Sequence, residues 1–374
     1  MYSKKEYLRH GILFIATLIS TTLAGAEWVY GKSVLGEGES LLTWEYFWMS
    51  MAFSVPFIGI LLIHELGHFF TAIYHKVKCT LPFFIPGWLG FIGIPTIGTF
   101  GAVIQMKGFV NSRKKFFDIG VAGPLAGFVI ALLVLIYGFT TLPEADYIYA
   151  IHPEYADVDF QGYEEGALDF ELGNNLLFWG LGEVFADPDR MPAMSEVIHY
   201  PYLFAGFLAL FFTALNLLPI GQLDGGHVIF GLFPKRHREI SLVAYILFIG
   251  YAGLGMISPY SPMEDLMLWI PLYVGFLFIC FTKSGLSLKN RITLVLSIAA
   301  AQYAVAFVMP NVHGYQGWLF YGLLLGRIMG LRHPEVSGFH ELDTKRKALG
   351  ILAIVVFILC FSPEPFIFSE DSSF

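Results

Sequence analysis

Residues 57–75 read FIGILLIHELGHFFTAIYH, an apolar run interrupted by a glutamate between two histidines, His64-Glu65-Leu66-Gly67-His68. Residues four apart on a helix project from nearly the same face. Both imidazoles can therefore bind one metal ion while the glutamate reaches a water molecule on it. The motif is short and recurs by chance on the surfaces of soluble proteins. Inside an apolar helix, however, these polar groups are costly without a metal, so we predict a metal site at His64 and His68.

The composition of the whole chain is that of a polytopic membrane protein. Of its 374 residues 56% are hydrophobic and only 14% are charged, compared with about 25% charged in soluble proteins. This composition argues against a secreted protein or a cytosolic enzyme, and the net charge of −8 argues against a nucleic-acid binder. The three cysteines, Cys79, Cys280 and Cys360, are far apart and have no CxxC spacing. They predict neither a disulfide framework nor a cysteine zinc site.

Apolar runs long enough to cross ~30 Å of hydrocarbon occur along the chain. We expect an all-α polytopic membrane protein with about nine transmembrane helices, at residues 11–29, 46–75, 119–141, 202–232, 240–257, 266–282, 292–309, 316–331 and 347–362. The first is interpreted as a retained helix or signal anchor. The stretch 81–101 contains several prolines and glycines, which suit no straight helix, and Thr99–Lys107 alternates like a strand. We interpret this region as a re-entrant, partly β-like element between the second and third helices.

The positive-inside rule orients these spans. With the N-terminus in the cytosol, all of the 22 basic residues except Lys32 and Arg190 fall in cytosolic loops or ends. If 81–101 crossed the membrane, every later loop would be inverted and this agreement lost. The loop 143–199 then lies on the outer side. This loop is strongly acidic. Two functions would fit it, gating of substrate access or binding of cations. We favour the simpler interpretation that it is a solvated outer loop.

Two acids lie well inside the predicted spans, Glu65 and Asp224. An ionisable group in hydrocarbon costs at least about 2.5–3.5 kcal/mol, so both mark a functional site. Catalytic zinc takes three protein ligands and leaves one position for water. The two histidines and Asp224 each precede a basic cytosolic anchor by about 8–12 residues, which places all three at a similar depth of ~12–18 Å. Asp224 is therefore the predicted third ligand.

These residues resemble the site-2 protease family of intramembrane zinc metalloproteases, in its form without a PDZ domain. The resemblance rests on the HExxH motif and on Asn216-Leu-Leu-Pro-Ile-Gly-Gln-Leu-Asp-Gly-Gly226. Residues 120–127, GVAGPLAG, are similar to the middle core helix of the family, although Gly127 stands where many members have asparagine. Thr99-Phe-Gly101 stands where members without a PDZ domain have a membrane-embedded hairpin. The resemblance covers about residues 46–232.

The resemblance implies an endopeptidase that hydrolyses peptide bonds in or near transmembrane segments of other membrane proteins. One zinc ion per chain would be held by His64, His68 and Asp224, with Glu65 as the general base. Asn216 would contact the substrate or the transition state; alternatively, it ends the helix before Pro219. The expected partners are single-span membrane protein substrates and the lipid bilayer, without nucleic acid, in a bacterial or archaeal cell membrane. The oligomeric state is not indicated.

We expect three regions along the chain. Residues 1–45 form an N-terminal transmembrane helix and an outer loop, and residues 46–232 form the metalloprotease core. This core consists of three helices, a re-entrant segment at 79–118 and the acidic outer loop. Residues 233–374 supply further transmembrane helices of unknown role.

Two other functions fit parts of the pattern. A membrane cation transporter would use the histidines and Asp224 as an ion site, but further polar residues would then line a path through later spans. An inactive metal-binding scaffold would not need Glu65. The Gly/Pro-rich stretch 81–108 either pairs with an unwound substrate as an added strand or simply covers the site.

Overall fold

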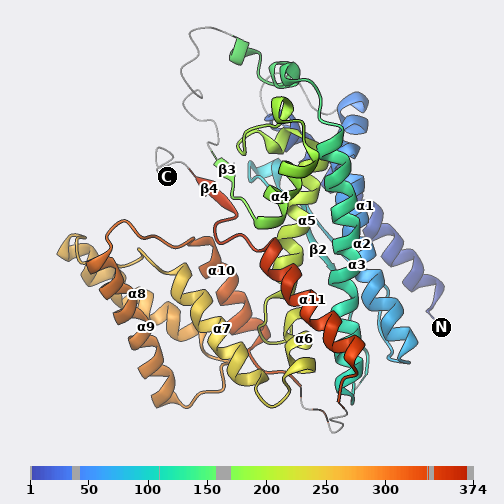
Figure 1. The fold of residues 1–374 in the computed structure, drawn as a ribbon. Coiled ribbons are helices and arrows are strands. Elements are labelled where there is room, and N and C mark those ends of the chain that lie inside the picture. Colours follow the sequence, from blue (N-terminus) through green and yellow to red (C-terminus); the bar gives the residue numbers. More distant parts are fainter. Residues whose placement is uncertain are drawn as a thin grey trace. The chain divides into compact units, whose positions relative to one another are not determined.

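The computed structural model describes residues 2–35, 43–108, 110–156, 170–334, 336 and 341–368, and over these the chain is mostly helical (Figure 1). It forms two compact units, each described by itself. The first combines Met1–Val110, Ala122–Leu215 and Val355–Phe374, and the second combines Asn111–Val121 and Asn216–Ile354. Residues 157–169 of the predicted acidic loop lie outside the described residues.

Five of the described helices are long and apolar enough to cross a membrane: α1 (Lys4–Tyr30), α2 (Trp44–Tyr74), α3 (Arg113–Thr140), α8 (Met263–Cys280) and α9 (Leu288–Val308). The shortest of them, with 18 residues, is ~27 Å long and so matches the thickness of the hydrocarbon core. The prediction of a helical, multi-pass membrane protein is confirmed. The number of nine spans stays a prediction.

The other predicted spans contain shorter helices, namely α5 (Pro201–Leu217), α6 (Asp224–Leu232), α7 (His237–Ala252), α10 (Gly317–Leu323), which continues as a π-helical segment over Leu324–Met329, and α11 (Thr344–Cys360). The span predicted over 202–232 is not one continuous helix. Pro219 lies in the break between α5 and α6, and a proline inside a helix removes a backbone hydrogen bond and clashes with the preceding turn. Gly221 adopts a left-handed φ of 58° in the same break.

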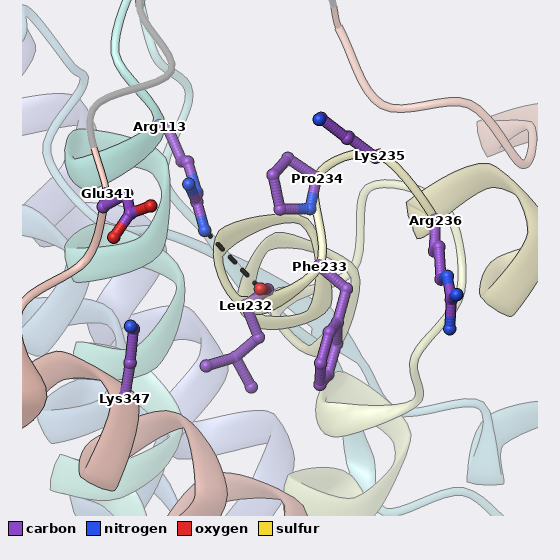
Figure 2. A pocket seen from close by; sticks show the side chains of 8 residues that line it. All are labelled: Arg113, Leu232, Phe233, Pro234, Lys235, Arg236, Glu341 and Lys347. Carbon is purple, nitrogen blue, oxygen red and sulfur yellow. Dashed lines mark hydrogen bonds between the residues drawn. The ribbon is translucent and has the colours of Figure 1, made fainter.

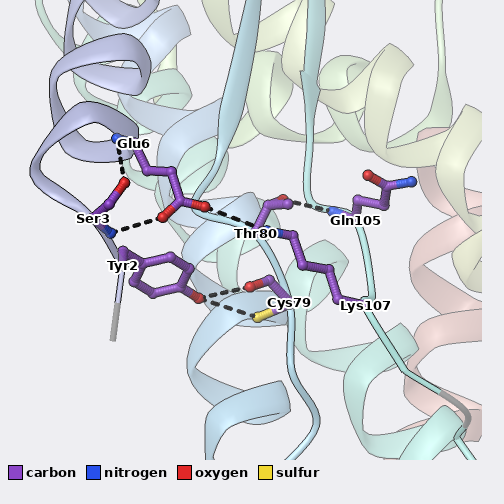
Figure 3. Close-up of polar contacts among 7 residues, drawn as sticks. All are labelled: Tyr2, Ser3, Glu6, Cys79, Thr80, Gln105 and Lys107. Carbon is purple, nitrogen blue, oxygen red and sulfur yellow. Dashed lines mark hydrogen bonds and ion pairs between the residues drawn. The ribbon is translucent and has the colours of Figure 1, made fainter.

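The start of α1 is fastened to the segment between α2 and α3. The Ser3 hydroxyl accepts a hydrogen bond from the Glu6 amide, and the Ser3 amide donates to the Glu6 carboxylate, which forms a capping box. The Glu6 carboxylate also bonds Lys107 Nζ (3.4 Å), and the Tyr2 hydroxyl donates to the carbonyl of Cys79 (2.7 Å) (Figure 3). Both ends of the segment that carries the β-hairpin therefore contact the N-terminus of α1.

That segment forms an antiparallel hairpin of β1 (Phe83–Gly87) and β2 (Gly98–Val103). The β-like conformation predicted there is confirmed over the strands; its position in a membrane stays a prediction. Gly98 has a φ of 79°, and a Cβ at this residue would lie 2.4 Å from the carbonyl oxygen of Ser20 on α1. The Ser20 hydroxyl donates to the Gly98 carbonyl (2.7 Å). The hairpin backbone therefore packs directly on α1.

Outside its long helices, the first unit also contains a short helix and a pair of short strands. The helix α4 (Leu176–Phe185) lies inside the predicted outer loop and begins at Asn175, whose side chain accepts from the amide of Phe178. The strand β3 (Phe170–Leu172) precedes α4 and pairs antiparallel with β4 (Phe366–Phe368) (Figure 1). The predicted loop is thus partly ordered by a strand from the far end of the chain.

In the second unit α7, α8, α9 and α10 pack together (Figure 1). Buried polar side chains link them. The Tyr273 hydroxyl on α8 donates to Gln302 on α9 (3.0 Å), whose amide nitrogen donates to the Gly250 carbonyl on α7 (2.9 Å). The Tyr245 hydroxyl on α7 donates to the Gly322 carbonyl on α10 (2.8 Å). Such bonds contribute about 0.6–2 kcal/mol each between membrane helices.

Candidate metal centre

The HExxH motif lies on α2, and its three polar side chains are buried. His64, Glu65 and His68 are each 6–7% exposed. The Nε2 atoms of the two histidines are 3.0 Å apart, and the rings meet edge to face with centroids 4.8 Å apart. The structure thus brings the two predicted imidazole ligands together, as their spacing on a helix requires.

The separation of the imidazole nitrogens suits a shared metal ion. With zinc–nitrogen bonds of about 2.0–2.1 Å, two ligands of a tetrahedral site lie ~3.3–3.4 Å apart. The observed 3.0 Å is close to this value. The donor set also fits, because imidazole nitrogen is a preferred zinc ligand.

Glycines of α3 form a cradle around the histidine pair. A Cβ at Gly123 would lie 2.2 Å from Nε2 of His68, and one at Gly127 would lie 3.1 Å from Cβ of His64. A Cβ at Gly67 would in turn lie 2.6 Å from the carbonyl oxygen of Ala122 on α3. The lack of side chains at Gly123 and Gly127 therefore lets α3 approach the histidine pair closely.

Substitution of Gly123 by alanine should weaken metal binding. The added methyl group would overlap the His68 ring and push it away from His64, so we expect a ~10–100-fold loss of zinc affinity, the range seen when groups that orient ligands are changed. Competition with a chromophoric chelator measures this affinity. Gly59→Ala on α2 is the matched control, since its Cβ meets no described atom within 4 Å. An unchanged affinity in Gly123→Ala would contradict the cradle.

Asp224 is the first residue of α6 in the second unit and is half-buried. The two glycines after it have a structural role. A Cβ at Gly225 would lie 2.0 Å from the carbonyl of Leu217, and one at Gly226 would lie 2.3 Å from that of Gly221. The break between α5 and α6 therefore folds back onto the first turn of α6, which only glycine permits.

Asn216 lies on the last turn of α5, one residue before the helix ends, and is half-buried. This position agrees with the alternative that Asn216 ends the helix. Its role toward a substrate stays a prediction.

All three cysteines are shielded from solvent. Cys79, Cys280 and Cys360 are free and buried. Burial raises the pKa of the Cys79 thiol, although the hydrogen bond from Tyr2 opposes this shift. Burial, together with the neighbouring Cys79, raises the pKa of Tyr2 to about 12. Both groups are therefore neutral at pH 7.

A basic cavity of about 380 Å³ lies in the second unit (Figure 2). It is lined by Arg113, Leu232, Phe233, Pro234, Lys235, Arg236, Glu341 and Lys347. The Arg113 guanidinium donates to the carbonyls of Gly231 (2.8 Å) and Leu232 (3.5 Å). A cation at the last carbonyls of a helix stabilises its C-terminus, so Arg113 holds the end of α6.

Histidines that the sequence left without a role form a packed cluster in the second unit. His227 and His333 are joined by a hydrogen bond (2.8 Å), and His333 stacks on Phe230 with centroids 3.8 Å apart. Burial and the neighbouring His227 lower the pKa of His333 to about 3, so this ring is neutral. The cluster has the character of a packed interior.

A second group of ligand-type side chains lies outside the residues predicted from the sequence. His152, Glu196 and His199 come together in the first unit, with ligand atoms all within 4.8 Å of one another. The only local signal is the three-residue spacing of Glu196 and His199; His152 is remote in sequence.

Comparison with known proteins identifies related chains. The model of the family described as "Peptidase family M50" matches residues 52–257, more than half of the chain. The "Probable zinc metalloprotease EGY1, chloroplastic" of Arabidopsis thaliana is 34% identical over 198 residues, which cover 53% of this chain and 32% of the relative. The corresponding protein of Oryza sativa subsp. japonica is 36% identical over 183 residues, 48% of this chain and 27% of the relative. "Probable zinc metalloprotease EGY2, chloroplastic" of Arabidopsis thaliana is 28% identical over 195 residues, 52% of this chain and 31% of the relative.

The matched region thus spans about a third of the length of these relatives. Their names place them in chloroplasts, so the comparisons do not support the bacterial or archaeal membrane expected from the sequence.

Proposed function

Because the chain belongs to peptidase family M50, we propose that it is an intramembrane zinc endopeptidase, which hydrolyses peptide bonds in or near transmembrane segments of other membrane proteins. One observation carries the proposal: α2, a helix long and apolar enough to cross a membrane, buries two imidazoles that share one face and a glutamate next to them. The relatives carry the name "Probable zinc metalloprotease", which supports zinc as the metal.

His64, His68 and Asp224 hold one zinc ion per chain in this proposal. Asp224 is supported as the third ligand by its place in the family motif and by the similar distance of all three residues from basic anchors. It also opens α6, where the positive end of the helix dipole stabilises negative charge. Three protein ligands leave one position for water.

The chemistry then depends on Glu65. A zinc ion at such a site supplies an acidified water molecule and polarises the scissile carbonyl. The Glu65 carboxylate accepts a proton from the attacking water and returns it to the leaving amine. Its burial keeps the carboxylate next to the two histidines and away from bulk solvent. Asn216 contacts the substrate or the transition state in the same proposal.

The chain crosses the membrane nine times, with its N-terminus in the cytosol and the loop 143–199 on the outer side. The asymmetry of basic residues supports this topology. Residues 46–232 form the catalytic core, and the helices after residue 233 are additional. The segment 79–118, which carries the β1–β2 hairpin, is re-entrant in this proposal. The packing of the hairpin backbone on α1 supports this placement, because irregular backbone is tolerated at membrane depth only where protein or water covers it.

The substrate is a single-span membrane protein, which must unwind before its backbone can be hydrolysed. We propose that the unwound substrate binds to the β1–β2 hairpin as an added strand, because extended peptides pair with the edges of sheets. The main-chain bonds would hold the substrate in the extended conformation that hydrolysis requires.

Removal of the metal should abolish proteolysis reversibly. The full chain in lipid vesicles, treated with 1,10-phenanthroline, should stop cleaving a single-span substrate, and added zinc should restore cleavage. The non-chelating isomer 1,7-phenanthroline is the control. Continued cleavage in the metal-free protein would contradict the proposal, and zinc flux across the vesicle membrane without cleavage would favour a transporter.

A further inference from the structure

A second set of metal-ligating side chains lies in the first unit, apart from the histidine pair on α2. His152 follows α3, and Glu196 and His199 lie shortly before α5. We propose that these three side chains bind a second zinc ion, which ties this part of the chain to the end of α1. The inference does not depend on the proposed proteolytic function.

Two of the three distances between the ligand atoms are close to those of a tetrahedral zinc site, and all three atoms lie within 4.8 Å of one another. Nε2 of His152 is 3.2 Å from Nε2 of His199, which is 3.6 Å from Oε2 of Glu196. These values bracket the ~3.3–3.4 Å expected between two ligands bound to zinc at about 2.0–2.1 Å. Two imidazoles and a carboxylate form a donor set that zinc uses, and the fourth position remains open.

The hydrogen bond of His199 orients its ring for metal binding. Nδ1 of His199 is 2.8 Å from the carbonyl oxygen of Val29, in the last turn of α1. A carbonyl only accepts, so Nδ1 carries the proton and Nε2 presents its lone pair to the other two ligands. Metal-ligating histidines are commonly held by such a bond through the other ring nitrogen. His199 is also only 4% exposed, so its ring is shielded from bulk water.

The carboxylate of Glu196 is positioned in a similar way. The Tyr155 hydroxyl donates to Oε1 of Glu196 (3.2 Å), which leaves Oε2 directed toward His199. The Tyr155 ring also stacks on His152, with centroids 4.8 Å apart and an interplanar angle of 14°. One tyrosine therefore orients two of the three ligands, as residues around metal sites commonly do.

A dication explains this convergence better than hydrogen bonds alone. With its proton on Nδ1, the neutral His199 ring turns the lone pair of Nε2 toward the carboxylate 3.6 Å away, and a metal ion between the two groups is attracted by both. A proton on Nε2 of His152 can form a hydrogen bond to one neighbouring acceptor, whereas a metal ion attracts the ligand atoms of His152, Glu196 and His199 together. Calcium and magnesium prefer oxygen ligands, so the two imidazoles select a zinc-like ion.

A metal ion at this site would connect separate segments of the first unit. Val29 lies in the last turn of α1, where carbonyl groups lack helical partners. The Tyr147 hydroxyl donates to the His199 carbonyl (3.0 Å), which also links the segment after α3 to the segment before α5. The ion would thus join the segment after α3 and the segment before α5 to the end of α1.

Counting zinc in the full-length purified protein tests the proposal. By inductively coupled plasma mass spectrometry, the wild type should hold two ions per chain. The double variant His64→Asn/His68→Asn should hold one, and His152→Gln/Glu196→Gln should also hold one. Asp189→Asn, which removes an exposed carboxylate nearby, is the matched control and should hold two.

These outcomes separate the two sites. If the His64→Asn/His68→Asn protein holds no zinc, or if the His152→Gln/Glu196→Gln protein still holds two ions, the second site is refuted. The zinc count does not use the cleavage assay, so a failure of the proposed proteolytic function would appear in that assay and not in the count. Should a variant fail to fold, anomalous scattering at the zinc edge from wild-type crystals decides the matter. A peak between His152, Glu196 and His199 is expected, and its absence would overturn the proposal.

Discussion

Replacing Glu65 with glutamine should lower the rate of substrate cleavage by about 10²–10⁴-fold, the usual contribution of a general base. Glutamine has nearly the same shape as glutamate but cannot accept the proton of the attacking water. The two imidazoles that bind the metal are untouched, so the zinc content should stay the same. The measurement pairs single-turnover cleavage of a single-span substrate in lipid vesicles with zinc analysis of the same sample.

The same helix offers a matched control. Glu45 is an exposed acid in the first turn of α2, so Glu45→Gln removes an equal charge far from the motif and should leave cleavage unchanged. Undiminished proteolysis in Glu65→Gln would show that another group is the base. Loss of zinc in Glu65→Gln would show that Glu65 supports the metal instead.

Replacing Asp224 with alanine is expected to remove both zinc and activity from the catalytic site. Two imidazoles alone make a poor zinc site, because structural and catalytic zinc sites use at least three protein ligands. Asp224→His, which supplies a different zinc ligand, should retain part of the metal. Metal content is measured after dialysis against a weak chelator, and cleavage is assayed in the same preparation.

Asp265 serves as the control for this substitution. It is an exposed acid in the first turn of α8, as Asp224 is an acid in the first turn of α6. Asp265→Ala should keep zinc and activity. If Asp224→Ala keeps its catalytic zinc, the third ligand is a different residue and the proposed ligand set is wrong.

Several features could be predicted from the sequence because their causes are local. A spacing of four residues brings His64 and His68 together on any helix, wherever that helix lies. The alternation and the glycine and proline content of the region after α2 indicate extended chain, and β1 and β2 occur there. The number of long helices was harder to predict, because runs of similar hydropathy form either long helices or shorter pieces such as α10 and its π-helical continuation.

The sequence by itself determined the membrane class, the helix that carries the metal motif and the residues able to bind a metal. These follow from composition and from the periodicity of a helix, which any short stretch reveals. Only the tertiary structure decided that Gly123 lies against the His68 ring and that His152 meets Glu196 and His199. Such contacts join residues on different elements, and no local periodicity encodes which backbone approaches which side chain. They are set by the packing of whole helices and loops.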